Sequence, residues 1–214
     1  MKGLNVLQSV IQRVLIVFLF NVLMLGVSGT SSAKPNHKSI ASPSAWRSNV
    51  AYSKQLASPV SVGEYYVRPP LGFTFEKKQL TGDAKTGEQY DWHGPAGPDG
   101  TRPRFVIAIF KLRPGAINQY DVETWLSSNL EAMNKNEKHY VHTGIEQGKV
   151  NGISFARAYW KRDPNDPDDG KRFHGFQYEY QQGAISLTII GDDVEPHYKS
   201  TLDLLEAAAL TFHQ

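Results

Sequence analysis

The chain has 214 residues, of which 40% are hydrophobic and 21% charged, and its formal net charge is +2 at pH 7. These fractions exclude a wholly disordered chain, a collagen-like chain and a membrane protein with several spans. The sequence contains no cysteine, which excludes disulfides, thiol catalysis and cysteine-ligated metals.

Residues 1–33 have the pattern of a secretory signal peptide. They contain no Asp or Glu, and they include a run of thirteen nearly all apolar residues, whereas a membrane span needs about 20. The small residues Ser31 and Ala33 predict cleavage between Ala33 and Lys34. An uncleaved signal anchor stays open as an alternative, because Asn21 interrupts the apolar run.

The exported chain carries a balanced charge. Removal of the first 33 residues takes away two cations and leaves 21 Lys and Arg against 21 Asp and Glu. Such a surface gives no electrostatic reason to bind nucleic acid or anionic lipid. We therefore expect a periplasmic or secreted protein without a nucleic-acid partner, attached to a membrane only if the N-terminal segment is retained.

Residues 34–61 read as a flexible tether that is rich in Ser, Ala, Asn and Pro. Their low apolar density does not offset the entropy lost on ordering. A short helix around residues 45–57 is compatible with the sequence, as is docking of Trp46 on the folded part. The domain itself is expected to span residues 62–214.

The first half of this domain shows the pattern of β-strands separated by Pro- and Gly-rich breaks. The expected strands are 64–67, 73–79, 88–93 and 104–112. Stretch 104–112 is apolar at its odd-numbered and its even-numbered positions, which face opposite sides of a strand. This predicts a central strand covered on both faces.

A helix is expected next, at residues 121–136, with Asp121 as its N-cap. Its apolar residues fall on one face, namely Val122, Trp125, Leu126, Leu130 and Met133. A second helix is expected from Pro196 to Leu210. Its inner stripe comprises Tyr198, Leu202, Leu205, Ala209 and Phe212.

Four more strands are expected between these helices, at residues 142–149, 153–162, 172–181 and 184–191. Turn signals such as Asn151-Gly152 connect consecutive strands. Connections this short require antiparallel hairpins. The sequence therefore predicts an α+β domain, a mostly antiparallel β-sheet packed with two amphipathic helices.

Four segments resemble the PsbP-like superfamily. They are Tyr66–Phe73 with its Tyr-x-x-Pro-Pro-Leu-Gly-Phe pattern, Asn151–Tyr159, Gly183–Ile190 and Leu204–Phe212. The resemblance covers about residues 62–214. It implies a PsbP-like fold and a non-enzymatic binding or assembly domain, and it assigns no partner-binding residue. A cystatin-like or NTF2-like α+β fold has the same order of elements.

Catalytic motifs are weak. Gly152–Ala156 lacks the second glycine of a hydrolase nucleophile elbow, and the sequence has no glycine-rich phosphate loop. The acidic loop 163–170 has oxygen ligands suited to calcium. Its EF-hand register fails, because Pro167 and His174 occupy the fifth and twelfth positions. We therefore expect no cofactor, and a solvated loop rather than a calcium site.

Two groups of residues are candidates for a site. The candidate metal ligands are Asp192, Asp193 and His197, although acidic residues are also typical of a helix start. The candidate binding residues, grouped by strand, are Arg157 with Tyr159 and His174 with Tyr178 and Tyr180. Their alternatives are a paired arginine and an aromatic stripe that lies in the core under a helix.

These observations predict an exported, non-catalytic binding or assembly domain whose partner is an unknown protein or small molecule. The first alternative is a hydrolytic or metal-dependent enzyme. It needs at least two of five side chains to meet in one cleft: Asp192, Asp193, His197, His93 and His174. The second alternative is a membrane-anchored structural protein that retains residues 1–33.

Overall fold

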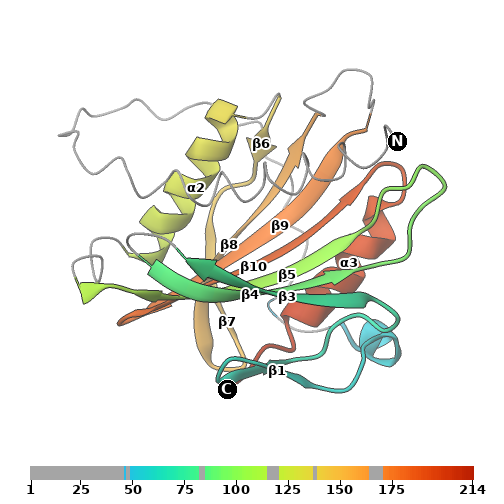
Figure 1. The fold of residues 1–214 in the computed structure, drawn as a ribbon. Helices are drawn as coiled ribbons and strands as arrows, with labels where there is room; N and C mark the ends of the chain where they lie inside the picture. The colour runs from blue at the N-terminus through green and yellow to red at the C-terminus, as the bar shows by residue number, and fades with distance from the viewer. Residues whose placement is uncertain (1–45, 47–48, 82–84, 115–120, 137–138, 164–170) are drawn as a thin grey trace.

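The structure is a computed structural model that describes residues 46, 49–81, 85–114, 121–136, 139–163 and 171–214 (Figure 1). The expected signal peptide, its cleavage site between Ala33 and Lys34, and residues 164–170 of the acidic loop lie outside the described residues. The elements, in chain order, are η1 (Val50–Gln55), β1 (Val60–Val62), β2 (Tyr65–Val67), β3 (Thr74–Thr81), β4 (Lys85–His93), β5 (Arg104–Leu112), α2 (Val122–Asn136), β6 (Val141–His142), β7 (Glu146–Val150), β8 (Ile153–Arg162), β9 (Phe173–Gln182), β10 (Ile185–Val194) and α3 (Tyr198–Ala209).

An eight-stranded antiparallel sheet carries the fold. Its strand order is β3-β4-β5-β10-β9-β8, with β6 and β7 both paired to the outer edge of β8. The central register places Ile107 beside Ile189 and Ile189 beside Tyr178. β1 and β2 form a separate hairpin. The expected α+β class, an antiparallel sheet with two helices, is confirmed.

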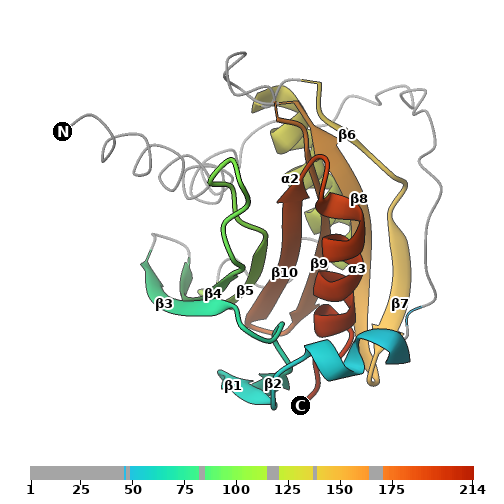
Figure 2. The same cartoon turned by 90° about the vertical axis from the view of Figure 1, so that its right-hand side faces the viewer.

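The two helices cover opposite faces of this sheet (Figures 1 and 2). Neighbouring residues of a strand point to opposite faces, so β5 contributes to two cores. Phe105 and Ile107 pack with Leu205 of α3, whereas Val106 packs with Leu126 of α2. The expectation that stretch 104–112 is covered on both faces is therefore confirmed. The main helix contacts are those of α2 with β8 and β9 and of α3 with β9 and β10.

The first long helix, α2, has the N-cap that the sequence predicts, whereas α3 is shorter than predicted at both ends. Asp121 precedes α2 and its Oδ1 accepts a hydrogen bond from the backbone N–H of Thr124 at 2.9 Å, as expected for an N-cap. α3 begins at Tyr198 and ends at Ala209. Phe212, expected on the inner stripe of that helix, instead lies in the segment that follows it.

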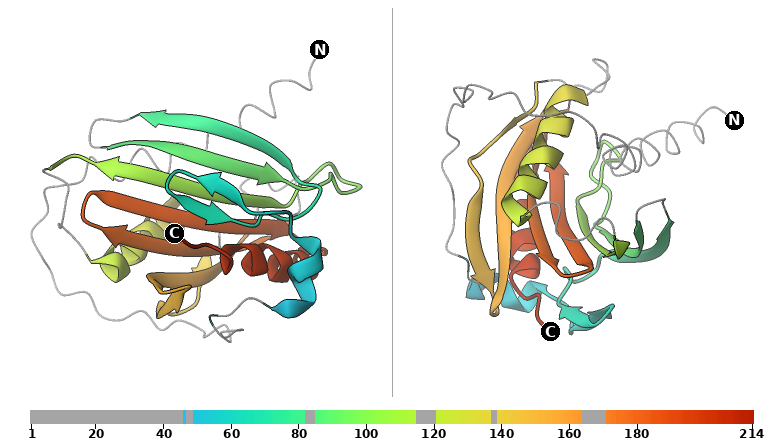
Figure 3. Two further views of the ribbon diagram at one scale, coloured as in Figure 1. Left: turned by 90° about the horizontal axis from the view of Figure 1, so that it is seen from below. Right: turned by 90° about the vertical axis from the view of Figure 1, so that its left-hand side faces the viewer.

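Part of the expected tether is packed on the domain. Residues 49–61 hold η1 and the start of β1, and Leu56 is 5% exposed within the main core. The guanidinium of Arg68 donates to the backbone carbonyls of Ser53, Leu56 and Ala57. The β1–β2 hairpin lies beside the C-terminal end of the chain, and η1 lies against α3 (Figure 3). Residues 49–61 therefore belong to the folded domain, which the sequence pattern placed at 62–214.

Candidate functional site

Three of the expected binding residues meet in a buried cluster beneath α3. Arg157 of β8 is 1% exposed, and its guanidinium donates to Glu146 Oε2 at 2.8 Å, Tyr178 Oη at 3.1 Å and Glu206 Oε1 at 3.2 Å. The hydroxyls of Tyr159 and Tyr178 both donate to the same oxygen of Glu206. We call these five residues the Arg157 cluster. Of the two interpretations offered by the sequence, the structure shows a paired arginine.

Electrostatics favour a charged Arg157 and a neutral Tyr178 in this cluster. Burial alone would lower the pKa of the Arg157 guanidinium, but contact with Tyr178, Tyr159 and Glu146 raises it above its usual value. Burial, together with the charge of Glu206, raises the pKa of Tyr178. Tyr178 therefore stays a neutral hydrogen-bond donor between two charged groups.

Trp46 closes this cluster from outside, so the expected docking of Trp46 on the domain is confirmed. The centroid of its ring lies 4.3 Å from the Arg157 guanidinium carbon and 5.4 Å from the Tyr178 ring centroid. Gly148 of β7 makes room for the indole, since a Cβ at that position would lie 2.2 Å from it. Arg157 is enclosed by the protein's own side chains. We therefore assign the cluster a structural role and not a binding role.

The other two expected binding residues lie away from Arg157. His174 pairs with Glu195, with Nε2 and Oε1 2.8 Å apart, and its ring stacks on Tyr198 with centroids 3.6 Å apart. Tyr180 packs edge-on against Tyr65. The aromatic stripe of β9 thus lies along the core under α3 at its centre and is half-buried at its two ends.

The candidate metal ligands at the end of β10 have separate partners. Asp192 Oδ2 accepts a hydrogen bond from Arg104 Nη2 at 3.1 Å. Asp193 points to the other face of the strand and its Oδ1 accepts from the backbone N–H of Val194. Burial raises the pKa of Asp193. His197 stands before α3 and makes no side-chain capping hydrogen bond.

A different group of charged residues gathers on the α2 side of the sheet, over β3, β4, β5 and β10. Its members, which we call the charged sheet face, are Glu76, Lys78, Asp91, His93, Arg104 and Asp192. The register places Glu76 beside Asp91, and one row runs from His93 through Arg104 to Asp192. His93 and Asp192, two of the five residues named for the enzyme alternative, therefore lie on one row with Arg104 between them.

Ion pairs connect the charged sheet face. Lys78 Nζ lies 3.0 Å from Glu76 Oε2 and 3.2 Å from Asp91 Oδ2. Burial lowers the pKa of His93 and so favours its neutral form, although the charge of Asp91 acts in the opposite direction. A neutral imidazole offers one donor and one acceptor nitrogen.

Sequence reasoning did not single out Glu76 or Asp91. The alternation of polar and apolar residues along 73–79 and 88–93 places both on a polar strand face. It does not set the register between the strands, so the pairing of Glu76 with Asp91 could not be obtained from it.

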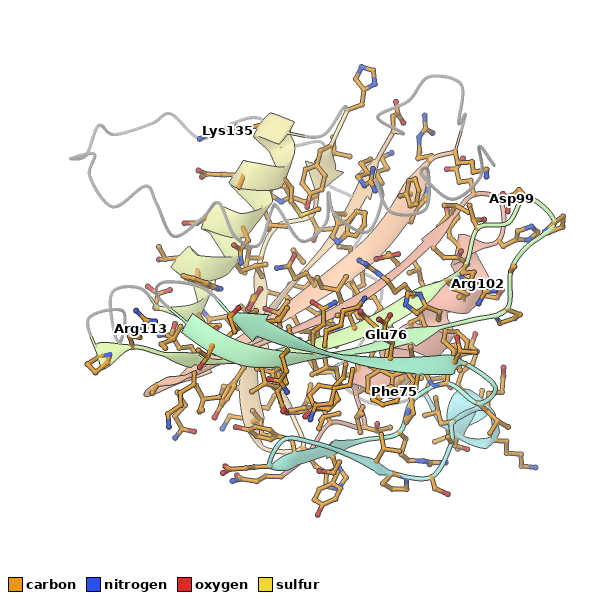
Figure 4. All side chains as sticks on the ribbon, viewed as in Figure 1. Phe75, Glu76, Asp99, Arg102, Arg113 and Lys135 are labelled. Carbon is orange, nitrogen blue, oxygen red and sulfur yellow. The ribbon has the colours of Figure 1, made fainter. Side chains whose placement is uncertain are left out.

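Strand β3 forms one edge of the sheet. Within the described parts of the chain it pairs with β4 alone. Phe75 and Glu76 point to opposite sides of this strand (Figure 4). Phe75 is 55% exposed, and its ring packs on Trp92 with centroids 5.2 Å apart. An exposed aromatic ring therefore lies on a strand whose outer edge pairs with no other strand among the described residues.

Among the helices that the structure describes, none is both long enough and apolar enough to cross a membrane.

The sequence matches no protein-family model and no curated protein. Among solved structures, a protein from Bacteroides thetaiotaomicron VPI-5482 is 10% identical, with a TM-score of 0.42 over 70% of this chain and 44% of that protein. LpqN, involved in cell envelope biogenesis of Mycobacterium tuberculosis, is 17% identical, with a TM-score of 0.39 over 72% of this chain and 86% of LpqN. This chain thus spans less than half of the Bacteroides protein. TM-scores below 0.5 establish no family, and the PsbP-like resemblance stays a prediction.

Proposed function

We propose that this chain is an exported, non-catalytic binding and assembly domain of the PsbP-like type. Its docking site is the outer edge of β3, which takes an extended segment of a partner protein as an added strand. The observation that carries this proposal is an eight-residue edge strand with Phe75 exposed on it. The residues quoted for the PsbP-like resemblance and the pattern of residues 1–33 support the fold family and the export.

The chemistry of the edge suits strand addition. An edge strand presents backbone N–H and C=O groups that pair with an extended peptide, and a side-chain anchor beside it gives specificity. The Phe75 ring supplies the anchor. Lysines often protect sheet edges, but Lys77 and Lys78 pair with Glu88 and Asp91 of the neighbouring strand. Their charges are thus directed toward β4 and away from an added strand.

We expect a photoreactive amino acid at position 75, introduced into the full chain in its own cells, to crosslink one envelope protein. The same amino acid at Val50, which is 82% exposed on η1, is the matched control and should give no such adduct. With the purified partner, Phe75→Asp should weaken binding by at least about tenfold, because a buried aromatic anchor carries much of the binding free energy.

Three results would contradict this proposal. The first is equal crosslinking from positions 75 and 50, and the second is unchanged affinity of the Phe75→Asp variant for the identified partner. The third is a hydrolytic turnover that a single point substitution abolishes, which would contradict the non-catalytic part.

The export proposal predicts the mature N-terminus. We expect mass spectrometry of the native protein to find a chain that begins at Lys34. Ala33→Arg should block this cleavage, since the position before the cut requires a small residue. Ser32→Arg is the matched control and should be cleaved normally, because the intervening position tolerates larger side chains. A native chain that retains residues 1–33 would instead support the signal anchor.

A further inference from the structure

Three potential metal ligands converge on the charged sheet face. Glu76, Asp91 and His93 each offer one donor atom, and these atoms all lie within 4.8 Å of one another. The sheet fixes this arrangement, because Glu76 and Asp91 are cross-strand partners and His93 follows two residues along the same face of β4. Two adjacent antiparallel strands thus hold all three ligands on a rigid support.

The buried carboxylate of Asp91 favours the binding of a cation at this cluster. The side chain of Asp91 is 2% exposed, and its Oδ1 has no hydrogen-bond partner among the residues that the structure describes. The other oxygen, Oδ2, accepts hydrogen bonds from Gln89 Nε2 at 2.7 Å and from Lys78 Nζ at 3.2 Å. A buried carboxylate oxygen without a partner is costly, and a coordinated metal ion would satisfy it.

The donor set selects the kind of ion. An imidazole with two carboxylates suits zinc and manganese, whereas calcium and magnesium prefer sites made of oxygen alone. We propose that Glu76, Asp91 and His93 bind one divalent transition-metal ion, Zn²⁺ or Mn²⁺, with its remaining positions open to water or to a partner's side chain. The site is independent of the strand-docking function, because it uses side chains on one face of the sheet and not the strand edge.

The ammonium group of Lys78 would compete with this ion for Glu76 and Asp91. This group lies between the two carboxylates and supplies the positive charge that a metal would otherwise bring. The second cation nearby, Arg104, is paired with Asp192. Removal of the Lys78 charge should therefore strengthen metal binding, whereas a lysine with a purely structural role would leave metal affinity unchanged.

The test is calorimetric titration of the full chain with Zn²⁺ in a buffer that does not chelate it. We expect one site, at least about tenfold weaker in Glu76→Gln and in His93→Gln, and tighter in Lys78→Met. Glu76 is 56% exposed, so its substitution leaves the fold intact. His139→Gln is the matched control for His93→Gln. His139 is 82% exposed and pairs with Asp163, and this variant should bind as the wild type does.

Thermal unfolding gives a second readout. Zn²⁺ should raise the melting temperature of the wild type and of His139→Gln, but not that of His93→Gln, because a ligand stabilises only the folded state that binds it. The proposal is overturned if the wild type binds no Zn²⁺ or Mn²⁺. It is also overturned if His93→Gln and Glu76→Gln bind Zn²⁺ as tightly as the wild type, which would assign the binding to other histidines.

Discussion

Replacement of Arg157 with methionine should lower the free energy of unfolding by about 3–5 kcal/mol, because it leaves buried groups without their charged partner. Arg157 is 1% exposed and donates hydrogen bonds to Glu146, Tyr178 and Glu206. In the variant, Glu206 keeps the hydroxyls of Tyr159 and Tyr178 but loses its cation. Denaturation in urea, followed by circular dichroism, measures the change.

Two further variants separate the ion pair from a general effect of losing an arginine. Arg172→Met removes an exposed guanidinium that pairs with Asp163, and its stability should stay close to that of the wild type. Arg157→Met combined with Glu206→Leu should recover part of the loss, because the second change removes the uncompensated buried charge. A single Arg157→Met variant as stable as the wild type would contradict the structural role of the cluster.

The partners of Arg157 could be predicted from the sequence only in part. The alternation along stretch 153–162 placed Arg157 on one face with Phe155 and Tyr159, and the structure has this arrangement. The same pattern allowed both a paired arginine and an exposed one. The deciding partner, Glu206, lies on α3, and no local signal gives the position of a helix on a sheet.

The strands themselves were easier to predict. β5 and β8 begin and end at the expected residues, because apolar runs and turn-forming residues define them locally. The charged sheet face was not predicted, because Glu76 and Asp91 belong to different strands. Their contact depends on the register across the connection between β3 and β4, which a strand pattern alone does not fix.

The packing of residues 49–61 on the domain was also beyond local patterns. Residues 49–61 have few apolar residues, and their composition favours a tether. Leu56 is buried nevertheless, and Arg68 donates hydrogen bonds to three backbone carbonyls of this segment. Tertiary contacts therefore fix the conformation of a segment whose composition alone predicts a flexible tether.

Phe212→Ala should cost about 3–5 kcal/mol of unfolding free energy, the usual loss for a fully buried phenylalanine. Phe212 is 0% exposed, although it lies beyond the end of α3 and two residues from the chain's last residue. Its ring stacks on Tyr65 with centroids 4.9 Å apart and meets Phe155 edge-on at 5.9 Å. The ring thus joins the β1–β2 hairpin to the main sheet, and urea denaturation measures its contribution.

His213→Ala is the matched control for this substitution. His213 is half-buried, and its backbone exchanges hydrogen bonds with Tyr66 of β2 at 2.8 and 3.0 Å. The substitution keeps these bonds, so it should cost much less than Phe212→Ala. Hydrogen exchange locates the difference, because loss of the Phe212 ring should first expose the amides of β1 and β2. Uniform loss of protection across the sheet in Phe212→Ala would show that the ring stabilises the whole core and does not act as a local link.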